Sequence, residues 1–468
     1  MKKKVIYAAT AALMFAAGST FAQGVGNTAT TAQAGNTNMA TVDQVNGMGN
    51  VVVVQQNGTD HDATVLQNNG ELNNASITQA GNNNDATSAQ YGGYDNDLTV
   101  AQYGANNDAS VLQSGGSFHD ASVLQSGENN AAATRQESGE NNNLWIEQRG
   151  SDNEVTIDQF DGMNNEAMVN QHGVRQVAAV TQEDGLGNST LVNQEGDGNY
   201  AFVDQWGGED NDAVVRQGGI ENAAEVYQWG GDDNDARVTQ AGYRNYTMVD
   251  QQDGRNNDAD VTQDGSGNAA EVHQWGGVDT DARVNQTGDW NNAYVHQQGG
   301  EENDVAVDQV GVGNAAAAMQ VGGYDNDADF EQEGVANLAG IVQYGGAYND
   351  AEIEQSGYFN MAGIAQVEGY DNYALIEQEG SANLAGVLQL GGAYNSAYVS
   401  QDGDFNLAGV AQSGLYNTAT IMQEGSSHAA AVLQGGALNS ATINQMGGSG
   451  NAAGIMQLGV GNTSVINQ

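Results

Sequence analysis

The chain has 468 residues, 65 of them glycine, with no proline, no cysteine and 59 acidic residues against 11 lysines and arginines. The lack of cysteine excludes disulfide stabilisation, and the acid excess disfavours nucleic-acid binding, because phosphate contacts need a basic surface. Aliphatic residues are interleaved with Asn, Gln and Asp throughout, so no segment is expected to supply the thick core of an ordinary globular domain.

The N-terminal segment, residues 1–22, has the layout of a secretory signal peptide. Three consecutive lysines form a basic start, residues 5–17 are a short apolar run, and small residues lead to a predicted cleavage site after Ala22. The apolar run is too short to cross a bilayer, and no other segment approaches the necessary length. Cleavage leaves eight arginines and 59 acids, a formal charge of 8 − 59 = −51 over residues 23–468. The sequence therefore predicts a secreted and strongly acidic chain.

A glutamine recurs along the chain in steps that alternate between eleven and twelve positions, so that every second glutamine completes one 23-residue period. The register begins at Gln33 and runs to Gln412 without slipping. Three steps of eleven positions follow, and the register ends at Gln457 and Gln468. All thirty-nine positions are Gln, and the residue six positions earlier is Asn in thirty-four of them. Such strict periodicity indicates a repeat protein rather than a disordered polar chain.

Each of these glutamines ends a seven-residue segment with the pattern N-x-A-x-V-x-Q, as in residues 199–205. Period-two alternation over this length predicts a β-strand. The Asn, the small residue, the β-branched residue and the Gln project to one face, and mostly polar residues project to the other. We predict that the Asn and Gln side chains form amide ladders from repeat to repeat. Representative ladder residues are Asn199, Gln205, Asn211, Gln217, Asn222, Gln228, Asn406 and Gln412.

Each predicted strand is followed by a turn with a glycine at a fixed place. The turn reads Q-x-G-x-x-N after one set of glutamines and is one residue longer, with glycine at the third position, after the other set. A glycine at a fixed turn position predicts a backbone angle that other residues avoid. Representative turn glycines are Gly196, Gly208, Gly219, Gly231 and Gly403.

Two strands and two turns make one 23-residue coil, so residues 23–468 are expected to form a single all-β array of about nineteen coils. The predicted fold is a two-sheet β-solenoid with parallel, in-register strands. One coil buries two β-branched side chains, about 3–6 kcal/mol together, while ordering its backbone costs about 1–2 kcal/mol per residue. An isolated repeat is therefore not expected to fold, and stability must come from stacking.

The unit Q-x-G-x-x-N-x-A-x-x-x-Q, as in residues 401–412, resembles the curlin repeat. The resemblance covers essentially all of residues 27–468. It implies a secreted subunit of a curli-type functional amyloid of biofilm matrix and surface adhesion. It also implies export through an outer-membrane secretion pore and polymerisation on a nucleator subunit. Two features depart from the family pattern: both strands of each coil begin with Asn, and Asn27 opens the first strand without the Gly-rich segment that follows the signal in curlins.

No recognisable nucleophile motif or phosphate-binding lysine is present, so we expect neither an enzyme nor a bound cofactor. Three of the six histidines, His61, His119 and His428, occupy the Asn position of the repeat. They are either metal ligands or polar substitutes in the ladder, and the second interpretation is favoured.

Acidic turns on one edge of the array are the best candidates for a small-ligand site. They are similar to the G-G-x-G-x-D calcium repeat but lack its third glycine and its nine-residue period. Stacked carboxylates repel, and hard divalent cations relieve that repulsion. The candidate calcium ligands are Asp210, Asp212, Asp233, Asp235, Asp279 and Asp281, although a solvated acidic edge is the favoured interpretation.

The outward residues of one sheet become apolar near the C-terminus. Seven coils of this kind would expose a patch of several hundred Å², more than a soluble monomer usually leaves bare. We predict that this glycine-lined face packs laterally against a second array or an anchoring partner. Its residues include Leu338, Gly340, Met361, Gly363, Leu384, Gly386, Leu407 and Gly409.

The array begins soon after the signal and its register ends on Gln468, without a predicted cap at either end. An open coil offers unpaired backbone groups to another strand. The predicted function is therefore structural: a homopolymer that grows end to end into an extracellular, cell-surface fibre. The alternative is a soluble, secreted, calcium-responsive β-solenoid that serves as a binding or adhesion module.

Overall fold

The computed structural model describes residues 17–468, which form forty β-strands and no helix. Within this range, no segment has the helical length and apolar character that crossing a membrane requires. The chain divides into two compact units, the first ending at Gly187 and the second beginning at Asn188. Residues 1–16 of the predicted signal peptide lie outside the described residues, while residues 17–22 form the first part of strand β1.

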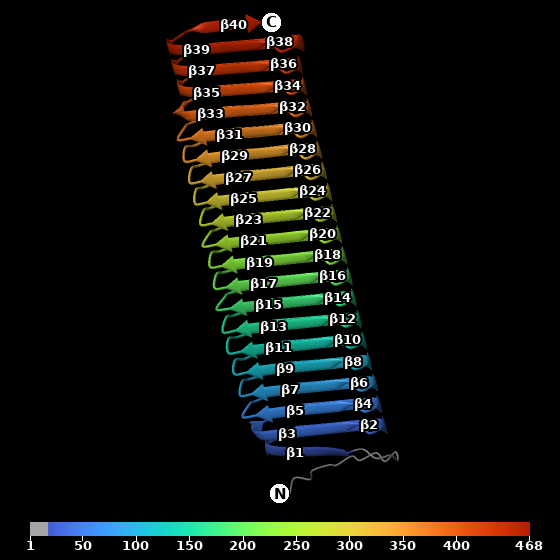
Figure 1. Cartoon of the computed structure of the whole chain (residues 1–468). Helices are drawn as coiled ribbons and strands as arrows, with labels where there is room; N and C mark the ends of the chain where they lie inside the picture. The colour runs from blue at the N-terminus through green and yellow to red at the C-terminus, as the bar shows by residue number, and fades with distance from the viewer. Residues whose placement is uncertain (1–16) are drawn as a thin grey trace. The chain divides into compact units, whose positions relative to one another are not determined.

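The first unit contains fifteen strands in two parallel sheets (Figure 1). The odd-numbered sheet consists of β1 (Ala17–Val25), β3 (Met39–Met48), β5 (Asp62–Asn68), β7 (Asp85–Tyr91), β9 (Asp108–Ser114), β11 (Ala131–Glu137), β13 (Glu154–Phe160) and β15 (Val177–Glu183). The even-numbered sheet consists of β2 (Thr28–Asn36), β4 (Val51–Thr59), β6 (Asn74–Asn82), β8 (Asp97–Ala105), β10 (Asp120–Glu128), β12 (Asn143–Ser151) and β14 (Glu166–Val174).

The second unit repeats this arrangement with twenty-five strands. Its even-numbered sheet consists of β16 (Ser189–Asp197), β18 (Asp212–Ile220), β20 (Asp235–Tyr243), β22 (Asp258–Ser266), β24 (Asp281–Asp289), β26 (Asp304–Val312), β28 (Asp327–Val335), β30 (Asp350–Tyr358), β32 (Tyr373–Ser381), β34 (Ser396–Asp404), β36 (Thr418–Ser426), β38 (Ser440–Ser449) and β40 (Thr463–Asn467). Its odd-numbered sheet consists of β17 (Tyr200–Trp206), β19 (Ala223–Trp229), β21 (Tyr246–Gln252), β23 (Ala269–Trp275), β25 (Asn292–Gln298), β27 (Ala315–Val321), β29 (Leu338–Tyr344), β31 (Met361–Val367), β33 (Leu384–Ala393), β35 (Leu407–Leu415), β37 (Ala429–Ala437) and β39 (Ala452–Val460).

Strands pair with the equivalent strand of the next coil, in parallel and in register. In the pair β17–β19, for example, Tyr200 lies opposite Ala223 and Gln205 lies opposite Gln228. The predicted β-solenoid of 23-residue coils is thus confirmed. The forty strands make about twenty coils where the sequence predicted nineteen, because β1 begins at Ala17, within the predicted signal.

The interior of each coil is formed by alternate residues of its two strands. In β17, Ala201, Val203 and Gln205 are buried, whereas the residues between them are partly exposed. Buried Ala, Val and Ile side chains form the apolar part of the interior in both units, and Asn and Gln form its polar margins. The period of two places these residues on one face because successive side chains of a strand point to opposite sides.

The turns differ in length on the two edges of a coil, as the sequence predicted. Where the chain shortens to 22-residue coils, the longer turn loses one residue, and the ladder continues without a break. Gln401 thus donates to Gln423, 22 residues away, through a hydrogen bond of 2.8 Å. Adjacent strands absorb the change in local register shifts between Leu390 and Ala393 and between Glu424 and Ser426.

Candidate functional site

The glutamines form continuous side-chain ladders through the interior of both units. The Nε2 atom of Gln205 donates to Oε1 of Gln228 at 2.8 Å, and Gln228 donates to Gln251 at 2.9 Å. On the other sheet, Gln217 donates to Gln240 at 2.8 Å. Each side chain therefore donates to one neighbour and accepts from the other, which satisfies an amide that would be costly to bury alone.

The same glutamines also tie the two sheets together. The second amide hydrogen of Gln205 reaches the backbone carbonyls of Ser189, in the facing sheet, and Asn211, in the following turn, at 3.1 and 2.9 Å. Gln217 likewise donates to the carbonyl of Tyr200 at 2.8 Å. The carbonyl of Asn211 also accepts the backbone N–H of Ser189 at 3.0 Å, so the glutamine adds a second bond to an oxygen that already joins two coils. Glutamine has both the length to reach these carbonyls and a second hydrogen for the ladder.

The asparagines form a side-chain ladder over part of the array and join the other coils through the backbone. Oδ1 of Asn199 accepts the backbone N–H of Asn222 at 3.0 Å, while its side-chain amide donates to the carbonyls of Glu195 and Gly219, near the ends of β16 and β18, at 2.9 and 3.3 Å. Direct bonds between asparagine side chains join other coils, such as Asn107 to Asn84 at 3.1 Å, and they run without a break from Asn303 to Asn462 at 2.9–3.1 Å. The asparagines thus cap the turns and join consecutive coils through the backbone and, over part of the array, through their side chains.

Equivalent bonds surround the remaining asparagines that the sequence singled out. Asn211 accepts the N–H of Asn234 at 2.9 Å, and Asn406 accepts the N–H of His428 at 3.0 Å. The side-chain amide of Asn406 donates to the carbonyl of Gly425 at 3.1 Å, and Gln412 donates to Gln434 at 2.9 Å.

The three histidines in the Asn position reproduce both asparagine contacts. Nδ1 of His61 accepts the backbone N–H of Asn84 at 3.3 Å, and its Nε2 lies 3.3 Å from the carbonyl of Asn57. His428 has the same two contacts, at 3.3 Å to the N–H of Asn451 and 3.1 Å to the carbonyl of Glu424. Burial lowers the pKa of His61 and favours the neutral imidazole, whose Nδ1 is an acceptor and whose Nε2 is a donor.

The five glycines that the sequence assigned to turns all have positive φ, although Gly196, Gly219 and Gly403 lie within the last residues of β16, β18 and β34. Their values are Gly196 113°, Gly208 75°, Gly219 108°, Gly231 72° and Gly403 117°. A Cβ atom on Gly219 would lie 2.1 Å from the carbonyl oxygen of Gly242 in the next coil, and one on Gly208 would lie 2.2 Å from the side-chain nitrogen of Asn211. These positions exclude a side chain both by backbone angle and by the close approach of the next coil.

Sequence reasoning missed a second positive-φ position, the residue directly before each asparagine. Asp210, Asp233 and Tyr348 adopt φ of 54°, 54° and 55° there. The available signal was the frequency of Gly, Asn and Asp at this place, since these residues tolerate the left-handed conformation. Bulky residues such as Tyr348 show that stacking overrides the local preference.

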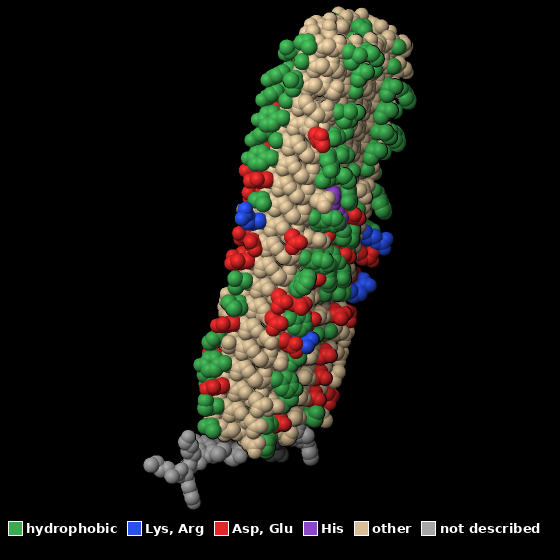
Figure 2. Space-filling view, turned by 90° about the vertical axis from the view of Figure 1, so that its left-hand side faces the viewer, with side chains coloured by type: hydrophobic (Ala, Val, Ile, Leu, Met, Phe, Trp, Pro, Cys, Tyr) green, Lys and Arg blue, Asp and Glu red, His purple; other side chains and the backbone are tan. Residues whose placement is uncertain are grey.

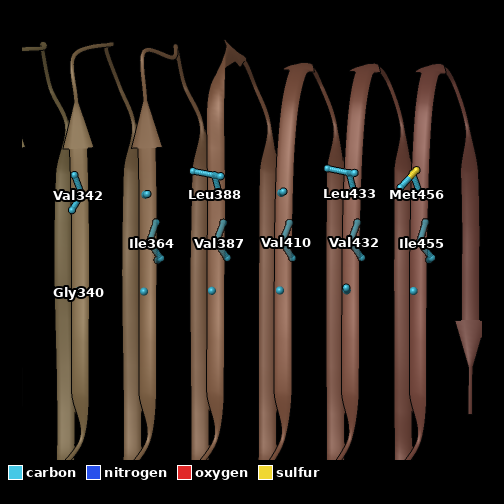
Figure 3. Close-up of a pocket in the computed structure, with 17 residues that line it drawn as sticks. Gly340, Val342, Ile364, Val387, Leu388, Val410, Val432, Leu433, Ile455 and Met456 are labelled. Atoms are coloured by element: carbon cyan, nitrogen blue, oxygen red, sulfur yellow. The ribbon is translucent and has the colours of Figure 1, made fainter.

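The predicted lateral face lies on the outward side of the odd-numbered sheet in the second unit. A shallow apolar trough of about 900 Å³ runs across β29 to β39. Figure 3 shows Val342, Leu388, Leu433 and Met456 in one row across these strands, with Gly340 in a parallel row. Hydrophobic side chains gather over the C-terminal coils in Figure 2, and charged ones are sparse there.

The floor of this trough is a column of glycines bordered by larger side chains. Gly340, Gly363, Gly386, Gly409 and Gly454 line it, with Ala431 between the last two. On one side the column is bordered by Leu338, Met361, Leu384 and Leu407, which are 43–49% exposed. The four glycines and four large residues of the prediction therefore stand in two adjacent columns over the same four coils.

A column of aspartates runs along the outward side of the even-numbered sheet. It takes the first strand position of seven consecutive coils, from Asp212 in β18 to Asp350 in β30. These side chains reach solvent, but partial desolvation beside their neighbours, followed by repulsion from the neighbouring carboxylates, raises the pKa of both Asp258 and Asp304 to about 6. Protonation of these aspartates therefore relieves the repulsion between carboxylates that the stacking of coils places next to one another.

The six calcium candidates are exposed and fall into two columns. Asp210, Asp233 and Asp279 occupy the positive-φ turn position, and the other three candidates belong to the aspartate column. Among residues 17–468, no three acidic, histidine or cysteine side chains gather in an arrangement able to hold a metal ion. A calcium role for these aspartates stays a prediction.

An aromatic column along one edge of the second unit was also missed. Tyr324, Tyr348, Tyr370, Tyr394 and Tyr416 follow one another with ring centroids 4.7–5.7 Å apart. The first three pairs meet edge to face and the last pair is stacked. The first three steps are alternately one position longer and one position shorter than the 23-residue repeat, and the last step falls in a 22-residue coil, so a search at a period of 23 does not find them.

Comparison with known families agrees with this geometry. A family model described as the curlin associated repeat matches residues 93–127, 139–173, 162–196, 185–219, 208–242, 231–265, 254–288, 346–380, 369–403, 392–421 and 417–447. These segments cover more than half of the chain. The chain belongs to the curlin repeat family. No curated protein matches it as a relative. Curlin repeats stacked in a β-solenoid are the architecture of a structural subunit, and the glutamine ladder, the turn glycines and the coil period of this curlin-repeat chain all fit that class.

Proposed function

We propose that this curlin-repeat chain is the subunit of a secreted, curli-type amyloid fibre of the biofilm matrix that polymerises by stacking coils end to end. The observation that carries the proposal is the in-register ladder. Within each unit, successive coils offer one another the same parallel backbone bonds and the same glutamine bond, as in Gln33 to Gln56 at 2.6 Å in the first unit and Gln445 to Gln468 at 3.0 Å in the second.

Self-complementarity of the coils supports polymerisation. One side of a coil presents glutamine Nε2 donors and the other side presents Oε1 acceptors, as Gln205 and Gln228 show at 2.8 Å. A coil of a second copy therefore meets the same pattern that joins coils within one chain. Cross-β assemblies use such amide ladders between chains.

The remaining parts of the proposal come from the family. By analogy with curlins, the chain is exported by its N-terminal signal, passes an outer-membrane secretion pore and starts polymerising on a nucleator subunit. The fibre contributes to surface adhesion, and the main partner is a further copy of the chain. None of these steps calls for a catalytic group or a cofactor.

Thioflavin T fluorescence and electron microscopy of purified residues 23–468 test the proposal. We expect unbranched fibres whose growth is accelerated by sonicated fibres of the same protein. A matched control uses seeds prepared from an unrelated amyloid, which should leave the lag time unchanged. A lasting monodisperse species, with calcium-dependent folding, would instead establish the soluble calcium-responsive module.

A further inference from the structure

The apolar face of the odd-numbered sheet carries the glycine column described above, here called the groove, beside the column of Leu and Met side chains, here called the ridge. In β29, β31, β33 and β35, the first outward position is Leu or Met and the next is Gly. In β27, where the first position is Ala315, the second is Ala317, and neither a ridge nor a groove is present. In these coils the ridge occurs only beside the groove, and the groove alone continues to Gly454 in β39, where the first position is Ala452.

The glycines of this groove are not required by the fold of the chain itself. A Cβ atom on Gly340, Gly363 or Gly386 would lie 3.9–4.0 Å from the nearest backbone oxygen, and one on Gly409 would meet no atom within 4 Å. None of these four residues has positive φ, in contrast with the turn glycines. Because glycine weakens a strand, an external reason for this column is indicated.

Charge points to the kind of molecule that covers the face. From β29 to β39 the outward residues of this sheet include no acid and no arginine, whereas the facing sheet of the same coils carries Asp350, Glu352 and Glu354 in β30 alone. Two copies of a chain with a charge of −51 approach most easily where neither bears charge. The apolar face is the region that allows this.

We propose that the face binds the same face of a second copy, with the Leu and Met ridge of each copy seated in the glycine groove of the other. This rests on the proposed fibre function, because the paired objects are two stacks of coils that lie side by side. The coils of a second copy have the same spacing, about 4.8 Å, as the coils of the first. Four ridge residues of one copy can therefore contact four glycines of the other at the same time.

Reciprocal seating also fixes the relative direction of the copies. The two columns are about 6.7 Å apart, two residues along a strand. A two-fold axis parallel to the stacking direction, midway between the columns, places each ridge over the other groove. A two-fold axis along the strands would place ridge on ridge and glycine on glycine. The paired stacks therefore run in the same direction, as growth of both from one end requires.

The face is large enough for a specific contact. Six coils at about 4.8 Å and a width of about 20 Å give about 600 Å² per copy, or about 1,200 Å² for the pair. Stable interfaces begin near this size. Longer fibres multiply the contact because each added copy contributes the same area.

A lysine in the groove tests the pairing. Gly386→Lys has room to fold because its Cβ is unobstructed, and Leu375→Lys is the matched control at the middle outward position of the facing sheet in the same coil. We expect Gly386→Lys fibres to elongate from seeds as usual but with a two-fold lower mass per length in scanning transmission electron microscopy. The control should keep the original mass per length.

Cysteine cross-linking tests the direction, because the chain has no cysteine of its own. In fibres grown from an equal mixture of Leu384→Cys and Gly386→Cys chains, oxidised glutathione should link the two variants to each other. Cross-links between two Leu384→Cys chains alone would overturn the parallel arrangement. Unchanged mass per length in Gly386→Lys fibres would overturn the pairing, whereas a failure of wild-type chains to elongate would refute the fibre function itself.

Discussion

The backbone N–H of Asn142 donates to Nδ1 of His119 at 3.2 Å, so an imidazole replaces the asparagine carboxamide between two coils. Nε2 of His119 lies 2.6 Å from the carbonyl of Ser138, the bond that the asparagine side-chain amide makes elsewhere. The ring can hold both contacts only while it is neutral, because a protonated Nδ1 is no longer an acceptor. The hydrogen bonds of His119 are thus a pH-sensitive contact between two coils of the first unit.

We predict that His119→Asn removes an acid sensitivity of this coil. Burial lowers the pKa of His119 below 6.5, so its stabilising contribution is present above pH 6.5 and is lost as the pH falls through the lowered pKa. Hydrogen exchange of the Asn142 amide, followed by mass spectrometry between pH 7 and pH 5, measures the loss after correction for intrinsic exchange. Protection that falls equally in the wild type and in His119→Asn would contradict the prediction.

The aspartate column of the second unit should respond to pH in the opposite sense. The pKa of Asp258 and of Asp304 is raised to about 6, so their contribution is fully present below the unfolded pKa of about 4 and is lost as the pH rises through about 6. We expect the urea midpoint of the second unit to be higher at pH 4.5 than at pH 7. The double variant Asp258→Asn and Asp304→Asn should flatten this dependence, and an equally steep profile would refute the assignment.

Replacing one ladder glutamine by an apolar residue should be strongly destabilising. Gln228→Leu removes the acceptor of the Gln205 side-chain amide and the donor to Oε1 of Gln251, and each buried polar group that loses a bond costs about 1–3 kcal/mol. A loss of about 2–6 kcal/mol is expected in urea unfolding. Gln298 is exposed, so Gln298→Leu is the matched control and should change the free energy of unfolding by less than about 0.5 kcal/mol.

Three glycine-to-alanine changes should separate the roles of glycine in this fold. Gly219→Ala forces a Cβ to 2.1 Å from a carbonyl oxygen at a φ of 108°, so a cost of about 3 kcal/mol or more is expected. Gly345→Ala meets no atom but keeps a φ of 61°, which costs about 1–2 kcal/mol. Gly386→Ala should be neutral or slightly stabilising in the free subunit. Thermal unfolding of the three variants checks this order, and equal losses would contradict it.

Fibre growth should accelerate with ionic strength. Approaching copies repel over a Debye length, which shortens from about 10 Å at 0.1 M salt to about 3 Å at 1 M. We expect shorter thioflavin T lag times in sodium chloride, and at lower concentrations in magnesium chloride. Lag times that do not change with salt would show that charge repulsion does not limit assembly.

Periodicity along the chain was sufficient to predict the coil, the faces of its strands and the stacking of identical residues. Gln205 and Gln228 are one period apart and lie opposite each other, because equal coils bring equal positions into register. The outward apolar face followed from the same reasoning, since the period of two assigns Leu384 and Gly386 to one side of β33.

Other features depended on distances that only the folded turns set. Asn199 was expected to bond to its counterpart side chain, yet its Oδ1 accepts the backbone N–H of Asn222, whereas Asn349 does donate to the side chain of Asn326. The contact of Tyr324 with Tyr348 joins two different repeat positions, so no period predicts it. The raised pKa of Asp258 likewise needs both partial desolvation and stacked neighbours. Sequence by itself determined which residues repeat and which face they take, because both follow from counting along the chain. Tertiary structure decided which atoms of those residues meet, because hydrogen bonds and ring contacts depend on turn geometry within a few tenths of an ångström.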